Sequence, residues 1–267
     1  MSLSLDSDLK KIFLKILKLK NNTIVFQTDV LNTSIFYKTE PKKVAKKIIF
    51  LIENIFKNKT ILFPAFSNDI IHKKKFDITK SSINTGLIPK LILKRNYYRT
   101  FSPLHSFLVK GPGIIEIKKL NQITTWGEGS VFEWLEKKNA RWVAFNLNWE
   151  RGCAFAHRSE EICKVPYRFY KTFYGKLYKN RKFIKNISEK KFSNYKGIKL
   201  IKDNISAYKS LERKDSITFV INKGLFAKTA CTKDISKHNC LFLRKNKFGR
   251  IKNKKQVINW LKKKNKL

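Results

Sequence analysis

The sequence predicts an α/β fold with a mainly parallel central sheet flanked by helices. Helical and buried extended segments alternate over residues 9–66, in the order helix, strand, helix, strand. Beyond residue 167, short alternating runs such as 217–221 predict additional antiparallel strands in the C-terminal part. The chain has no internal repeat and no Gly/Ser linker, so we expect a single domain over residues 1–267.

Each early element has its own signal. Apolar residues at helical spacing over 9–17, after a candidate N-cap at Ser7 or Asp8, predict the first helix. The β-branched apolar run 23–27 predicts a buried strand. Pro41 starts a helix that we expect to reach about residue 57, and the next strand follows at 60–66.

Later elements are predicted from shorter patterns. Ser130 and Glu133 form a candidate capping box for a helix at 130–138. The remaining expected elements are a polar loop with a Lys run at 67–75, helices at 85–95, 154–163 and 254–264, and strands at 106–110 and 142–147.

The charge is extreme, with 59 Lys and Arg against 19 Asp and Glu, a formal net charge of +40. No apolar run approaches the ~18 residues of a membrane span, and the acidic N-terminus lacks the basic start of a signal peptide. We therefore expect a cytoplasmic protein without a membrane partner. The 42% hydrophobic content excludes a disordered basic tail.

Such a charge indicates either nucleic-acid binding or compositional drift towards Lys. Drift is favoured, because only 10 of the 59 basic residues are Arg, the residue that reads base edges bidentately. Residues 124–161 are nearly neutral, whereas residues 164–267 carry 31 basic and 5 acidic side chains. A segment that resists the drift has a role that Lys would disturb.

The four cysteines do not form a convincing metal or disulfide pattern. Cys231, His238 and Cys240 lack a fourth ligand and the paired spacing of a zinc knuckle, so no metal is expected. Cys153 lies four residues before His157, which leaves a Cys–His nucleophilic pair open. A small buried thiol is the simpler interpretation.

His157 and Glu160 are the best candidates for catalysis. A spacing of three places both side chains on one helix face. A nearby carboxylate raises the pKa of an imidazole and fixes its tautomer, as a general base requires. The preceding strand would bring this helix to the carboxyl end of the sheet, where α/β proteins place their sites.

Two turns could bind anions. Residues 99–107 hold Arg99 and His105 with serines around a Pro turn, which suits a phosphate or a carbonyl. Residues 125–131 carry two glycines before Ser130, so their N–H groups could bind an anion or an oxyanion. This pattern matches neither known nucleotide-binding glycine motif.

Six ordered segments carry a family resemblance. They are Phe63-Pro-Ala-Phe-Ser67, Phe76-Asp-Ile-Thr-Lys-Ser81, Gly86-Leu-Ile88, Arg99–Phe107, Thr125–Val131 and Ala154-Phe-Ala-His-Arg-Ser-Glu160. Together they resemble the aminoglycoside 3-N-acetyltransferase family, which is unrelated to the GNAT fold. The resemblance covers roughly residues 23–175, and the basic part at 180–267 matches poorly.

The resemblance implies an acetyltransferase that uses acetyl-CoA to acylate a primary amine of a sugar-like acceptor. His157 would deprotonate the amine, and Glu160 would orient it or balance its charge. The residues implied at the acetyl-CoA site are Thr28, Asp29, Ser81, Arg99, Ser102, His105, Ser106, Gly127 and Ser130. Gln27, Ser102 and Ala154 depart from the family pattern, because they replace two His and a Thr.

The charge also bears on the acceptor. A +40 protein repels a polycationic aminoglycoside, so a nucleotide-linked or surface-glycan amino sugar is the preferred acceptor. Two alternatives stay open, a catalytically degenerate binding protein and a Lys-rich nucleic-acid-binding protein. A homodimer is left open too. Asp29, Glu128 and Glu150 are acidic candidates for contact with the amine.

Overall fold

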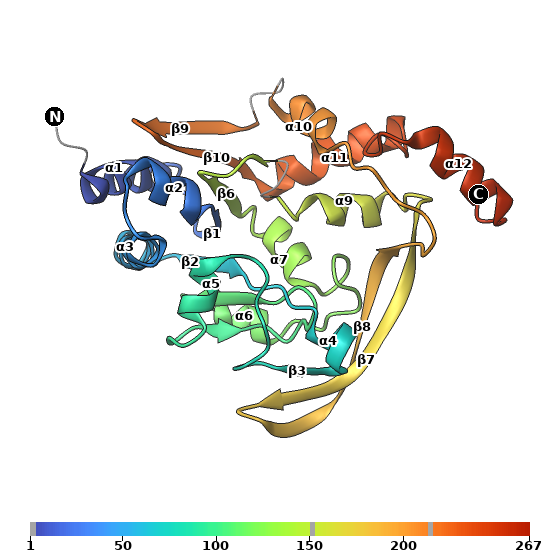
Figure 1. Ribbon diagram of the computed structural model, residues 1–267, viewed down its shortest axis with the longest axis horizontal. Helices are drawn as coiled ribbons and strands as arrows, with labels where there is room; N and C mark the ends of the chain where they lie inside the picture. Colours follow the sequence, from blue (N-terminus) through green and yellow to red (C-terminus); the bar gives the residue numbers. More distant parts are fainter. Residues whose placement is uncertain (1–3, 150–152, 213–215) are drawn as a thin grey trace.

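A central mixed sheet organises the chain. The computed structural model describes residues 4–149, 153–212 and 216–267 (Figure 1). In these residues the main sheet has the strand order β4-β5-β2-β1-β6-β10-β9. Its strands are β1 Thr23–Thr28, β2 Thr60–Pro64, β4 Tyr98–Arg99, β5 Phe107–Lys110, β6 Arg141–Phe145, β9 Thr218–Asn222 and β10 Leu225–Cys231. The predicted α/β class is confirmed. In the main sheet, parallel pairing is confined to β2-β1-β6 and the pairs on both sides are antiparallel, so the expectation of a mainly parallel sheet holds only for these central strands.

The central strands are buried on both faces by helices. Ile24 and Phe26 of β1 lie in one apolar core and Val25 lies in the other, because successive side chains of a strand alternate between faces. Helices α1 Leu5–Leu17, α3 Pro41–Ile55 and α5 Leu87–Ile92 contribute to the first core. Helices α7 Val131–Lys137 and α11 Thr232–Lys245 contribute to the second, and α9 Ala156–Ile162 packs against α11.

Helix starts follow the local signals with one correction. Pro41 is the first residue of α3, and Ser130 caps α7 by accepting the Glu133 N–H at 3.1 Å. The first helix starts earlier than predicted, at Leu5 with Ser4 as its N-cap. Asp8, one of the two candidate N-caps, is buried and accepts a hydrogen bond from the Tyr37 hydroxyl at 2.9 Å. Its carboxylate therefore makes a tertiary contact and does not cap the helix.

The expected polar loop at 67–75 is a second correction. This segment contains helix α4 Asp69–Lys73, and strand β3 Lys75–Asp77 starts at its end. Phe76 is fully buried and lies opposite Leu177 in a parallel pairing with β7. The run of lysines gave no indication of a strand, because the partner strand lies about 100 residues later in the chain. No local sequence pattern predicts a pairing over that distance.

The C-terminal part contains the predicted antiparallel strands. Strands β7 Arg168–Lys179 and β8 Lys182–Asn194 form a long hairpin along one side of the molecule (Figure 1). The remaining helices are α2 Val30–Phe36, α6 Ile114–Lys118, α10 Asn204–Glu212 and α12 Lys254–Lys263. No described helix is long and apolar enough to cross a bilayer.

A buried carboxylate ties the hairpin to the main body. Glu189 of β8 accepts hydrogen bonds from the Ser102 and Thr125 hydroxyls and the Leu104 N–H at 2.7–2.8 Å. Gln122 adds a fourth donor at 3.2 Å. Burial raises the pKa of Glu189, and these donors oppose that effect. The loop that carries His105 is therefore fixed against the hairpin.

Replacement of Glu189 by Ala should destabilise the fold by about 3 kcal/mol or more, because buried donors lose their acceptor. Urea denaturation of the purified variant measures this loss. Lys182→Ala at an exposed position of the same strand is the control and should change stability little. Equal stability of the two variants would contradict the assigned role.

Candidate functional site

His157 and Glu160 form a close pair at the start of α9. The His157 Nδ1 atom lies 2.7 Å from Glu160 Oε2. The Glu160 side chain is fully buried, whereas the His157 side chain is 32% exposed. Arg168 Nη2 lies 3.1 Å from the same Nδ1 atom, which is the longer of the two contacts. Because a carboxylate only accepts, the shorter contact, with Glu160, places the proton on Nδ1 and leaves a lone pair on Nε2. This is the tautomer that a general base needs.

Positive charges surround Glu160. Arg168 Nη2 lies 2.8 Å from Oε2, while Lys202 Nζ and Arg250 Nε lie 3.4 and 3.8 Å from Oε1. The Tyr167 hydroxyl donates to Oε1 at 3.1 Å. Burial alone raises the pKa of Glu160, but the three cations hold that pKa well below its usual range. Glu160 is therefore anionic.

The same surroundings lower the pKa of His157 to about 3, mainly through burial. Arg168 and Lys202 lower it further, while Glu160 opposes them. Glu160 raises this pKa, as predicted, but burial, which the sequence does not show, outweighs that effect. His157 is neutral at physiological pH, as a proton acceptor must be.

His105 joins the site through tilted and edge-to-face contacts between rings. The Trp126 ring lies 4.0 Å from His105 and 5.1 Å from His157, measured between ring centroids. Phe66 covers His105 at 4.6 Å. Burial and nearby positive charge hold the pKa of His105 well below its usual range, so this ring is also neutral. The structure thus brings together two histidines that lie 52 residues apart.

Several residues expected at the acetyl-CoA site hold loops instead. The buried Arg99 guanidinium donates to the Ser81 and Ala65 carbonyls and to Ser106 Oγ, at 2.9–3.0 Å. The Ser102 hydroxyl donates to Glu189 at 2.8 Å. These groups have protein partners and position the 99–106 loop, although Ser102 also lines a cavity.

The glycine turn before α7 is also internally bonded. The Gly127 N–H donates to Thr124 Oγ1, and the Gly129 N–H donates to Glu133 Oε2, both at 2.9 Å. The Ser130 N–H reaches the Gly127 carbonyl. These N–H groups are not free for the expected anion or oxyanion, because they form the cap of α7.

Thr28 and Asp29 lie at the carboxyl end of β1. They line a cavity of about 440 Å³ together with Gly86, Leu87 and other residues. Asp29 also caps α2 by accepting the Asn32 N–H at 3.1 Å. This is the sheet edge where α/β proteins bind ligands, so Thr28 keeps its place as a candidate.

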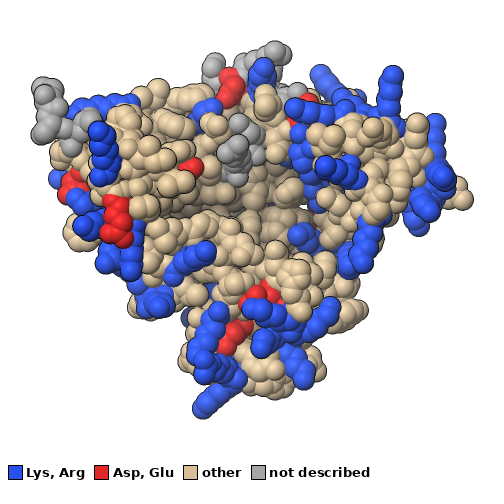
Figure 2. Space-filling view, viewed as in Figure 1, with Lys and Arg blue, Asp and Glu red and all other residues tan. Residues whose placement is uncertain are grey.

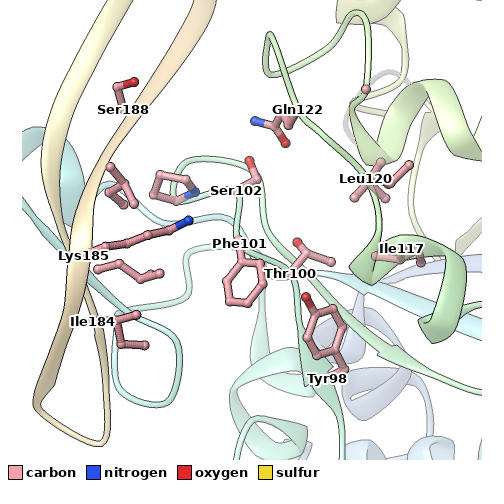
Figure 3. Close-up of a pocket in the computed structure, with 15 residues that line it drawn as sticks. Tyr98, Thr100, Phe101, Ser102, Ile117, Leu120, Gln122, Ile184, Lys185 and Ser188 are labelled. Carbon is pink, nitrogen blue, oxygen red and sulfur yellow. The ribbon is translucent and has the colours of Figure 1, made fainter.

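A second cavity lies between the hairpin and the main body (Figure 3). Its volume is about 450 Å³, and Phe101, Leu120 and Ile184 supply much of its apolar lining. Ser102 and Gln122, two of the groups that hold Glu189, are at its wall. Neither of these two cavities is lined by His157. The chemistry is therefore assigned from the side-chain contacts and not from cavity size.

The structure does not support the two alternative roles of the cysteines, a Cys–His nucleophilic pair and a zinc site. Cys153 lies outside α9, is buried, and has its pKa raised to about 12, so its thiol is neutral. Cys231 lies on β10, and Cys240 lies on α11. Among the residues that the structure describes, no group of three His, Cys, Asp or Glu could hold a metal ion. Glu150 lies outside the described residues.

Comparison with known proteins then identifies the family. The sequence profile described as aminoglycoside 3-N-acetyltransferase matches residues 45–232. The chain belongs to this family. The predicted family and its enzyme class, acyl-CoA-dependent N-acyltransferases, are confirmed. The match also extends beyond the predicted 23–175 into the basic C-terminal part. No curated protein sequence matches the chain.

Several solved structures share the fold. "AAC-IIIb binary with CoASH" superposes with a TM-score of 0.73 at 13% identity, covering 91% of this chain and 97% of that one. "AAC-VIa bound to Sisomicin" gives 0.69 at 12%, covering 92% and 98%. The YokD protein from Bacillus subtilis gives 0.70 at 12%, covering 90% and 99%.

The sequence did not reveal the cations of the site. Arg168 follows residues 157–160 and 165–167 closely in the sequence. Its position near the His157–Glu160 pair could therefore have been expected from the sequence. Lys202 and Arg250 lie 42 and 90 residues after Glu160, and of the two only Lys202 falls within the matched range 45–232. Both belong to a Lys-rich background, and nothing local distinguishes them.

A histidine pKa of about 3 has a direct spectroscopic consequence. The ring signals of His157 should not titrate between pH 5 and 8. Below the ordinary value of about 6.5 the unfolded chain binds a proton that native His157 refuses, so this group lowers stability as pH falls. Nitrogen-15 NMR, with His157→Gln to assign the signal, tests this. A midpoint between pH 6 and 7 would refute it.

Proposed function

We propose that the protein transfers the acetyl group of acetyl-CoA to a primary amine of an amino sugar, with His157 as the general base. The observation that carries this proposal is the 2.7 Å contact between His157 Nδ1 and the buried Glu160 carboxylate. A neutral imidazole held in one tautomer, next to solvent, suits proton abstraction from an ammonium or amine. Family membership supplies the reaction class.

The proton and the bonds balance through His157. Nε2 accepts a proton from the acceptor amine as its nitrogen attacks the thioester carbonyl. Glu160 stabilises the imidazolium that forms, as carboxylates do in other His-dependent transferases and hydrolases. The tetrahedral intermediate then expels the CoA thiolate, which takes the proton back from His157. The C–S bond breaks, a C–N bond forms, and free CoA and an amide result.

Thr28 and Asp29 are proposed to contact acetyl-CoA at the carboxyl end of β1. The support is the adjoining cavity of about 440 Å³ and the relative that is described with CoASH. Lys and Arg side chains surround the face seen in Figure 2, while its middle is largely uncharged. A basic rim of this kind attracts the phosphates of CoA.

The acceptor is proposed to be less cationic than an aminoglycoside. One relative is described with sisomicin, but three cations flank Glu160 here, on a chain with a net charge of +40. Repulsion disfavours a polycation at such a centre. A nucleotide-linked amino sugar or an amino sugar of a surface glycan fits better. Acetylation of sisomicin with no turnover of nucleotide-linked amino sugars would refute this preference.

His157→Ala should lower kcat/KM by about 10²–10⁴-fold, the usual contribution of a general base, while leaving the Kd of CoA unchanged. CoA release should be followed by mass spectrometry, because the four free cysteines react with thiol dyes. His72→Ala, on an exposed position of α4, is the matched control.

The outcomes separate the alternatives. Near-wild-type turnover of His157→Ala would refute the assigned base. CoA binding without CoA release from acetyl-CoA, over a panel of free and nucleotide-linked amino sugars, would indicate a degenerate binding protein. Tight binding of DNA or RNA with a steep salt dependence would favour the nucleic-acid alternative.

A further inference from the structure

The catalytic pair lies in an excess of buried positive charge. Arg168, Lys202 and Arg250 share one carboxylate, that of Glu160, within 2.8–3.8 Å. A fourth cation, Lys191 of β8, lies 6.0 Å from the centre of the Trp126 ring, which in turn contacts His157. Two other buried carboxylates nearby already have neutral donors: Glu189 has four, and Glu161 accepts the Thr124 and Tyr170 hydroxyls. Near His157 the protein is thus richer in cations than in anions.

Only two of these cations can meet a ligand. Arg250 is 2% exposed, and the Arg168 side chain is 6% exposed and donates to the Phe192 carbonyl at 3.1 Å. The Lys202 side chain is 27% exposed and Lys191 is half-buried, so both lysines are more accessible than the two arginines. Their flexible stems allow the ammonium groups to move onto a bound anion.

We propose that Lys191 and Lys202 bind an anionic group of the amine acceptor, a phosphate or a carboxylate, and so determine acceptor specificity. This inference rests on the proposed function, because it takes the ligand of His157 to be the acceptor. Unbalanced charge in a partly desolvated site is costly, and an anion of the substrate removes that cost. A polycation would add to it.

The phosphates of CoA are the other possible source of the anion. In acetyl-CoA the long pantetheine arm separates these phosphates from the thioester. An anion site beside the base that serves the thioester is therefore better placed for the acceptor. An experiment with one arm for the acceptor and one for CoA distinguishes the two sources of the anion.

The probes are two matched pairs, D-glucosamine against its 6-phosphate and D-glucosamine against its 1-phosphate. Each pair has the same amine with and without a phosphate. Calorimetric titration into the CoA-saturated wild-type protein should show at least one phosphate binding about tenfold or more tighter than D-glucosamine, as expected for charge-assisted contacts. The Lys191→Met/Lys202→Met variant should bind both members of each pair within about twofold.

Matched variants isolate the two lysines. Lys182→Met/Lys199→Met removes two exposed charges from the same strand and the same loop, and it should keep the preference. Lys191→Arg/Lys202→Arg keeps the charge and should retain the preference as well, which controls for misfolding. A wild-type protein with no preference, or a double Met variant that retains it, would overturn the proposal.

The two proposals fail in different ways. If the double Met variant loses affinity for CoA but treats the sugar pairs as the wild type does, the lysines bind CoA phosphates and this inference is wrong. If phosphate preference is present but no amine is acetylated, the proposed function fails while the anion site stands.

Discussion

The buried Glu160 carboxylate is the interaction on which the site depends. It fixes the tautomer of His157 through Oε2, and it gathers Arg168, Lys202 and Arg250 from three separate segments. An isolated buried carboxylate would be too costly, so these cations are required for the fold as well as the chemistry. Burial is the main reason that His157 stays neutral, and Arg168 and Lys202 oppose the effect of the anion beside it.

Glu189 shows the contrasting solution for a buried carboxylate. Its donors are hydroxyls, an amide and a backbone N–H, with no direct ion pair among the described contacts. Burial therefore raises the pKa of Glu189, while three cations lower that of Glu160. The first carboxylate fixes loops around His105 and Trp126, and the second holds His157, the proposed base. One fold thus uses two buried acids, one for positioning loops and one, as proposed, for catalysis.

Prediction from sequence succeeded where the pattern was local. Pro41 and the apolar spacing after it gave α3, and Ser130 with Glu133 gave the start of α7. The His157–Glu160 pair followed from helical spacing alone. Prediction failed where a distant partner decided the outcome. Phe76 lies in a strand because β7 pairs with that segment. Arg99 donates to loop carbonyls because the 65–82 segment encloses its side chain.

The sequence by itself determined the α/β class, the family and the two residues of the proposed catalytic pair, because periodicity and ordered motifs are local properties. Only the tertiary structure decided the protonation of that pair. The pKa of His157 depends on burial and on Lys202 and Arg168, and Arg250 contacts the same carboxylate from the far end of the chain. The electrostatic potential at one atom is the sum over charges that surround it in space. Its sign therefore cannot be predicted from neighbours in the sequence.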